Sequence, residues 1–179
     1  MVVSKFTIGS DQGLNMLVQL TAAIARENFV AFLSPDALEK YIDKTFNRKA
    51  ILTEINSMSN QYVTVYTDGE PAGYARISSR GNKPGMLADK RGLAIAEFGV
   101  LEKFIDEGAR ESLLAKCLAV VGNYDTTWIN LISGSPQIAF FESNGFIPLA
   151  NETVEYEGLS LPSVYLVKRL PVYDNFGDL

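Results

Sequence analysis

Histidine is missing from this sequence, and cysteine occurs once, as Cys117. Histidine is the commonest general base near neutral pH, so its absence excludes catalysis by a Ser-His or Cys-His pair. A lone cysteine forms no internal disulfide and builds no metal site by itself, and we predict no bound metal. Cys117 falls in the apolar stripe of a predicted helix, which favours a small core residue over a nucleophile.

Long apolar runs are also absent. No stretch approaches the roughly 20 apolar residues of a membrane-spanning helix, and the first residues lack the order of a secretion signal. We therefore expect a soluble, cytoplasmic protein with no membrane partner. The 179 residues, 47% of them hydrophobic, favour one well-packed domain over residues 1–170, followed by a polar tail at 171–179. Whether the chain forms a homodimer, and whether the tail docks on a partner, stays open.

An excess of positive charge is lacking as well. The 16 basic and 21 acidic residues give a net charge of −5. This balance disfavours non-specific binding to nucleic acid and is compatible with a cationic substrate.

The pattern of the first half of the chain predicts helices followed by a hairpin. Helical periodicity covers residues 13–29, and Ser34 with Pro35 begins a second helix that reaches residue 46. A short helical piece follows at 48–55. Two strand-like runs, 62–67 and 72–78, flank Asp68-Gly69, which is the strongest short-range hairpin signal.

The second half alternates strands and helices after a polar loop at 79–91. Leu93 to Leu101 is apolar except for Glu97, and simple alternation puts Ala96, Phe98 and Val100 on one side and Ile95, Glu97 and Gly99 on the other. Further elements are a helix at 108–121, a strand around 128–132, a helix at 137–144 that begins at Ser135-Pro136, a strand from 146 and a last strand at 164–170. This order predicts an α/β fold, a mixed sheet with helices on both faces.

Three segments carry a family resemblance: LSPDALEKYIDKTF (33–46), SNQYVTVYTDGEPAGYARI (59–77) and IAFFESNGF (138–146). With them the chain resembles the GNAT superfamily of N-acetyltransferases, and most of all its bacterial polyamine-type members. The resemblance implies a mostly antiparallel sheet. It also implies transfer of an acetyl group from acetyl-CoA to a primary amine of a small molecule or peptide.

The resemblance assigns cofactor binding to the strand end and the following helix start. Pyrophosphate would lie on backbone N–H groups of this helix start, where the helix dipole favours anions. Here Asp106 and Glu107 occupy phosphate-facing loop positions, and each carboxylate adds a repulsion of about a kcal/mol. Arg110 either offsets this by reaching the phosphates or pairs on the surface with these carboxylates. The residues assigned to cofactor binding are Phe98, Val100, Gly108, Ala109, Arg110, Ser112 and Phe141.

Glu97 is the predicted catalytic residue, a general base whose pKa burial would raise. The alternatives for Glu97 are a strand-end carboxylate in water or an ion pair with Arg76 across the sheet. Phe141 stands where GNAT enzymes often place a tyrosine that protonates the leaving thiolate. Tyr66 and Tyr74 are packing residues or line a substrate channel.

The loop at 79–91 carries a small basic stretch, Arg80, Lys83, Lys90 and Arg91. It is either a solvated face or a contact for the adenosine phosphate of the cofactor. Two functions follow from the sequence: an N-acetyltransferase, and a degenerate GNAT domain that binds or assembles without acetylating. They differ in whether residues 106–110 can hold a pyrophosphate.

Overall fold

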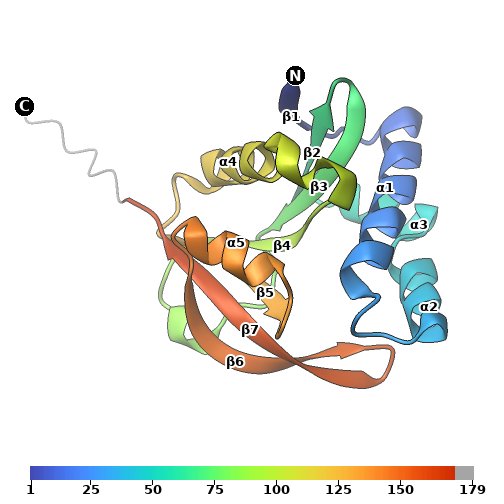
Figure 1. The fold of residues 1–179 in the computed structure, drawn as a ribbon. Helices are drawn as coiled ribbons and strands as arrows, with labels where there is room; N and C mark the ends of the chain where they lie inside the picture. Colours follow the sequence, from blue (N-terminus) through green and yellow to red (C-terminus); the bar gives the residue numbers. More distant parts are fainter. Residues whose placement is uncertain (172–179) are drawn as a thin grey trace, which may run out of the picture.

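The computed structural model describes residues 1–171, so the predicted tail lies outside the described residues except for Pro171. Seven strands form one sheet in the order β1-β2-β3-β4-β5-β7-β6 (Figure 1). Only the β4–β5 pair is parallel, which confirms a mixed, mostly antiparallel sheet. The strands are β1 (Val2–Phe6), β2 (Asn60–Thr67), β3 (Glu70–Ser78), β4 (Gly92–Val100), β5 (Thr126–Ile132), β6 (Ile147–Tyr156) and β7 (Leu159–Arg169).

Helices cover both faces of this sheet, as predicted. One face carries α1 (Asp11–Phe29), α2 (Pro35–Thr45) and α3 (Arg48–Ile55), and the other carries α4 (Ala109–Val121) and α5 (Gln137–Ser143). Side-chain oxygens of Ser10, Ser34 and Asn47 accept an N–H at the starts of α1, α2 and α3. Within residues 1–171, no helix combines the length and apolar character needed to cross a membrane.

Two tight turns shape the two hairpins of the sheet. Asp68 and Gly69 join β2 to β3 with φ of 49° and 86°, the left-handed pair that the Asp-Gly signal predicted. Glu157 and Gly158 join β6 to β7 in the same way, with φ of 49° and 79°. This second turn was not predicted, and the observed β7 begins five residues before the predicted start at 164.

The predicted alternation along β4 was wrong at its centre. In the β3–β4 register Arg76 lies opposite Glu97 while Ile77 lies opposite Ile95, so Ala96 is an extra residue, a β-bulge. A bulge shifts every later side chain by one position. Ile95 therefore packs in the same hydrophobic cluster as Phe98 and Val100.

β4 and β5 lie side by side only at their beginnings. The parallel pairing joins Gly92–Ala94 to Thr126–Trp128 and then ends. Beyond it the strands diverge, and no strand within residues 1–171 pairs with the remaining length of β4 on that edge. This divergence opens a gap in the middle of the sheet, bordered by helices from both faces.

Candidate active site

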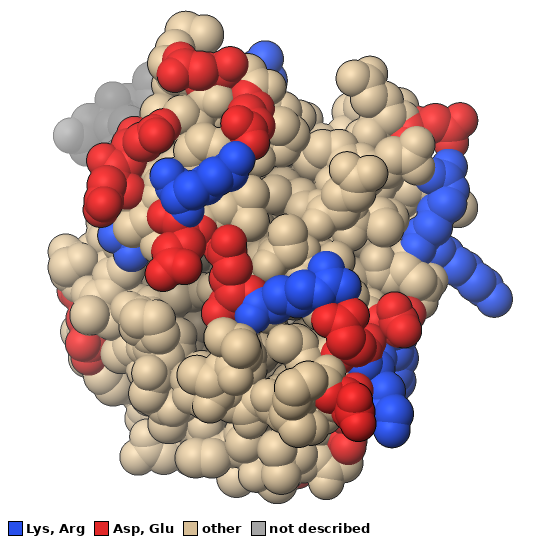
Figure 2. All heavy atoms as spheres, turned by 45° about the vertical axis from the view of Figure 1, so that its right-hand side comes forward, with Lys and Arg blue, Asp and Glu red and all other residues tan. Residues whose placement is uncertain are grey.

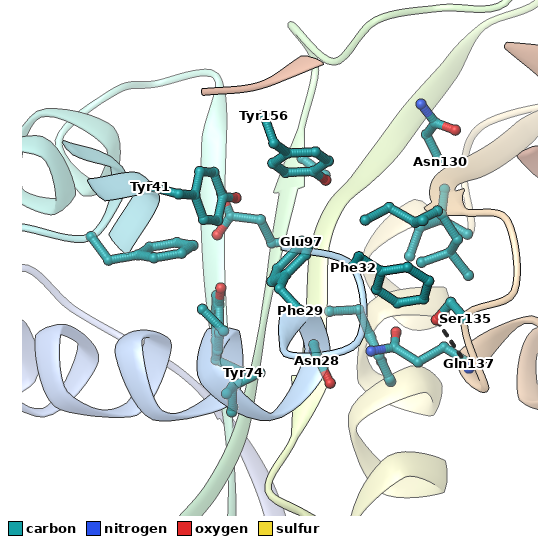
Figure 3. Close-up of a pocket in the computed structure, with 18 residues that line it drawn as sticks. Asn28, Phe29, Phe32, Tyr41, Tyr74, Glu97, Asn130, Ser135, Gln137 and Tyr156 are labelled. Atoms are coloured by element: carbon teal, nitrogen blue, oxygen red, sulfur yellow. Dashed lines mark hydrogen bonds between the residues drawn. The ribbon is translucent and has the colours of Figure 1, made fainter. Parts of the chain in front are cut away.

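A cavity of about 100 Å³ lies in the gap between the diverging strands (Figure 3). Its walls come from β4, β5, the C-terminal end of α1, α2 and the start of α5, and the β6–β7 hairpin adds Tyr156. Aromatic side chains dominate the lining, and among the described residues that form it Glu97 alone is charged. The aromatic lining residues are Phe29, Phe32, Phe46, Phe98, Tyr41, Tyr74 and Tyr156.

Glu97 reaches this cavity because of the bulge at Ala96 and is held by Arg76. The Arg76 Nε and Nη2 atoms donate to Glu97 Oε1 at 3.0 and 2.7 Å. Glu97 Oε2 is buried and has no hydrogen-bond partner within the described residues. The predicted ion pair of Glu97 with Arg76 therefore exists, and it uses only one carboxylate oxygen. The second oxygen, Oε2, remains free beside the cavity. Its role as a base stays a prediction.

Four tyrosines surround the Glu97–Arg76 pair: Tyr41, Tyr62, Tyr74 and Tyr156. Figure 3 shows three of these rings around the Glu97 side chain. Burial raises the pKa of all four phenols and the negative charge of Glu97 raises each further, for Tyr156 to about 12. Burial lowers the pKa of Arg76, but the Glu97 carboxylate, together with Tyr62 and Glu54, outweighs burial, so the pKa of Arg76 is raised. The cluster therefore keeps its phenols neutral around one ion pair.

The raised phenol pKa values predict a loss of stability in alkali. The folded protein holds these protons to higher pH than the unfolded chain, whose tyrosines titrate near pH 10. The free energy of unfolding should be unaffected below about pH 10 and then fall by about 1.4 kcal/mol per pH unit for each such tyrosine. Denaturant titrations on either side of that pH measure this slope. Tyr156→Phe should make the slope shallower, and an unchanged slope in this variant would contradict the prediction.

The tip of the β6–β7 hairpin closes one side of the cavity. Tyr156 packs on the rings of Phe29 and Tyr41, with centroid distances of 5.1 Å in both cases. Next to it, Glu157 pairs with Lys44 of α2 at 3.3 Å. Tyr41, Tyr62 and Tyr156 were not predicted as site residues. The one sequence signal that could have indicated Tyr156 is the Glu157-Gly158 turn, which makes a hairpin whose tip lies at the cavity.

Backbone N–H groups of β4 point into the gap. The Leu101 N–H bonds to the Ala72 carbonyl of β3 at 2.8 Å. N–H groups alternate between the two edges of a strand, so those of Phe98 and Val100 face the edge where β5 has diverged. Phe98 also lines the cavity, whereas the Val100 side chain is buried in the core. The two predicted strand residues thus offer donors for a carbonyl oxygen.

The start of α4 has features expected of an anion site, and it also carries an arginine, Arg110. Gly108 adopts φ of 80° just before the helix, and a Cβ there would meet nothing within 4 Å. No side chain caps α4, so its first N–H groups are not taken by a cap. The Arg110 guanidinium lies 4.9 Å above the Phe140 ring of α5, and its buried Nε has no partner within the described residues.

The predicted surface pairing of Arg110 with Asp106 or Glu107 was wrong. No ion pair joins them in residues 1–171, and both acidic side chains are exposed. Arg110 instead lies across the space between α4 and α5. It is therefore oriented toward α5 rather than toward the acidic loop.

Other predicted residues lie away from the cavity. The Ser112 hydroxyl hydrogen-bonds with that of Ser4 at 2.8 Å, and the Ser112 N–H donates to the Gly108 carbonyl at 3.0 Å, so this N–H is not free. Ala109 is fully buried. Phe141 is also fully buried, between other phenylalanines, and does not line the cavity. Cys117 is buried in the core, and burial raises its pKa to about 12, as a structural residue requires.

The remaining predictions concern the hairpin tyrosines and the basic loop. Tyr74 lines the cavity, whereas Tyr66 does not. Arg80 follows β3 near the beginning of β4, at the opposite end of that strand from Gly108. Contact of the basic stretch with the adenosine phosphate of the cofactor stays a prediction, as does its alternative, a solvated face. On the face drawn in Figure 2, which brings α1 to α3 forward, acidic and basic side chains are interspersed.

No protein-family model matches the sequence. Solved structures do match. A PaiA N-acetyltransferase from Thermoplasma acidophilum, crystallised in complex with coenzyme A, is 11% identical with a TM-score of 0.71, over 94% of this chain and 99% of that one. A probable acetyltransferase from Staphylococcus epidermidis is 13% identical with a TM-score of 0.71, over 96% of this chain and 100% of that one. A ribosomal-protein-alanine N-acetyltransferase from Escherichia coli is 11% identical with a TM-score of 0.67, over 100% of both chains. The chain has the fold of the GNAT N-acetyltransferases, as the sequence resemblance predicted.

Proposed function

We propose that this protein transfers an acetyl group from acetyl-CoA to a primary amine. The observation that carries the proposal is the free Oε2 of Glu97, a buried carboxylate oxygen beside an aromatic cavity at the point where β4 and β5 diverge. A buried oxygen without a partner favours a ligand that brings hydrogen-bond donors. An ammonium group brings three donors and a positive charge, and aromatic rings attract it as well.

In this reaction acetyl-CoA supplies the acetyl group as a thioester. Glu97 Oε2 takes one proton from the ammonium, and the amine nitrogen then bonds to the acetyl carbon. The N–H groups of Phe98 and Val100 hold the oxygen on which negative charge develops. When the carbon–sulfur bond breaks, its electron pair stays on sulfur, and the nitrogen releases its second proton to water so that a neutral amide forms. A thiol with a pKa of about 8.5 leaves as thiolate at neutral pH, so Phe141 need not supply a proton.

The residues at the start of α4 fit the coenzyme pyrophosphate. Gly108 leaves open space, the helix start is uncapped, and the Arg110 Nε lacks a partner. We propose that Arg110 turns from the Phe140 ring to the phosphates. This would offset the repulsion from Asp106 and Glu107, because charge-assisted hydrogen bonds from a guanidinium are the stronger kind.

The test is calorimetric titration with acetyl-CoA. We expect micromolar binding by the wild-type protein and a dissociation constant roughly tenfold or more higher for Arg110→Ala, since a hydrogen bond to a charged group contributes about 1.5–3 kcal/mol. Lys116→Ala is the matched control: its ammonium lies over the Phe6 ring, 4.6 Å from the centroid, and away from the helix start.

The rival function is a GNAT scaffold that binds or assembles without acetylating, and the exposed carboxylates of Asp106 and Glu107 beside Gly108 favour it. Absence of binding at millimolar acetyl-CoA would overturn the enzyme proposal in favour of this rival. Equal binding by wild type and Arg110→Ala would overturn only the role of Arg110.

A further inference from the structure

A second hollow, of about 470 Å³, adjoins the aromatic cavity on the same face of the sheet. Ala96 and Asn130 line both spaces, so the second one continues from the first along the gap. The lining of this hollow is mostly polar, whereas that of the cavity is mostly aromatic. The polar side chains are Thr53, Glu54, Ser57, Asn60, Arg76, Ser78, Arg80, Asn82, Asn130 and Tyr165.

The charges in this hollow leave one cation unmatched. Arg76 is shared between Glu97 Oε1, at 2.7 Å, and Glu54 Oε2, at 3.4 Å. Glu54 Oε2 also accepts from the Asn60 amide at 2.5 Å. Arg80 is exposed at the rim, and in residues 1–171 no carboxylate forms an ion pair with it. The hollow therefore presents a positive charge, whereas the adjoining cavity presents a free carboxylate oxygen.

From this arrangement we infer that the acceptor is an amine that also carries an anionic group, with its ammonium on Glu97 and its anion on Arg80. The inference rests on the proposed acetyl transfer and specifies its acceptor. A linear polyamine would place a second positive charge beside Arg80, and repulsion would oppose it. A carboxylate there instead gains charge-assisted hydrogen bonds from the guanidinium.

The strand register limits the length of this acceptor. Arg76 lies opposite Glu97, and Arg80 follows four residues later along the chain. At about 3.3 Å per residue, their Cα atoms are separated by at most about 13 Å. An extended tripeptide spans about 10 Å from end to end. The Asn60, Asn82 and Asn130 side chains would lie along it, and amide groups both donate to and accept from peptide groups. A short peptide with free termini is the acceptor class that fits.

The decisive comparison is triglycine against triglycine amide, which differ only in the terminal anion, together with a linear diamine of similar length. We expect kcat/KM for acetylation of triglycine to exceed that of the amide and of the diamine by about tenfold or more. Arg80→Gln should bring triglycine down to the level of the amide. Lys90→Gln removes a charge from the same loop without lining the hollow and should keep the preference.

A binding measurement separates this inference from the proposed chemistry. Trp128 is the only tryptophan and lines the hollow, so ligand binding there should change its emission. Triglycine should saturate that change at lower concentration than the amide in wild type and not in Arg80→Gln. If this difference appears without acetylation of any acceptor, the acceptor site stands and acetyl transfer is overturned. If the amide or diamine is acetylated as well as triglycine, or Arg80→Gln keeps the preference, the inference is overturned while the proposed function stands.

Discussion

Glu97→Gln is expected to lower kcat/KM for acetyl transfer by about 10²–10⁴-fold, the usual contribution of a general base. Glutamine keeps the shape of the side chain, so its carbonyl oxygen still accepts from Arg76 as Oε1 does at 2.7 and 3.0 Å. It cannot take a proton at the position of the free Oε2. Steady-state rates over a range of pH, with saturating acetyl-CoA, measure this loss of activity. They also show whether the part of the pH–rate profile that depends on the general base disappears.

Glu39→Gln is the matched control for this experiment. Glu39 likewise accepts from an arginine, Arg26, although through both of its oxygens, at 2.8 Å in each contact, and it lies outside the cavity. Its replacement should leave the rate unchanged. Binding of acetyl-CoA should be the same in all three proteins, because Glu97 lies away from the start of α4. A Glu97→Gln enzyme with an unchanged rate and pH profile would remove Glu97 from the reaction.

Phe141→Ala is expected to lower the free energy of unfolding by about 3–5 kcal/mol, the range for a large aromatic deleted from a packed core. Phe141 is fully buried, and its ring meets those of Phe98, Phe140 and Phe146 at centroid distances of 5.1, 5.5 and 5.0 Å. Denaturant titration measures the loss. Met58→Ala, at a fully exposed position, should stay within about 0.5 kcal/mol of wild type.

The same position tests whether a tyrosine there restores an acid. Phe141→Tyr would bury a hydroxyl among aromatic rings, at a cost of about 1–3 kcal/mol unless it finds a partner. Because Phe141 does not line the cavity, we expect no gain in the rate of acetyl transfer. A faster Phe141→Tyr enzyme would show that the ring can turn toward the reacting sulfur, contrary to the packing described above.

Much of the local structure could be predicted because its signals are local. Ser34 caps α2 and Pro35 opens it, and the Asp68-Gly69 turn adopts the left-handed backbone that its residue types favour. The bulge at Ala96 has no such signal. Alanine fits a regular strand equally well, and the extra residue becomes visible only when β4 is aligned against β3.

The sequence by itself determined the fold class, the element order and the classes of chemistry that are excluded, because periodicity, capping residues and the absence of histidine act within short stretches or on composition alone. It also identified Glu97 as the one charge in an apolar strand. Only the tertiary structure decided that Glu97 and Tyr156 line an aromatic cavity, that Arg110 lies over Phe140, and that Arg80 lines the hollow beside that cavity. These relations join residues far apart in the chain, and their positions depend on how far β4 and β5 diverge and on where the bulge turns each side chain.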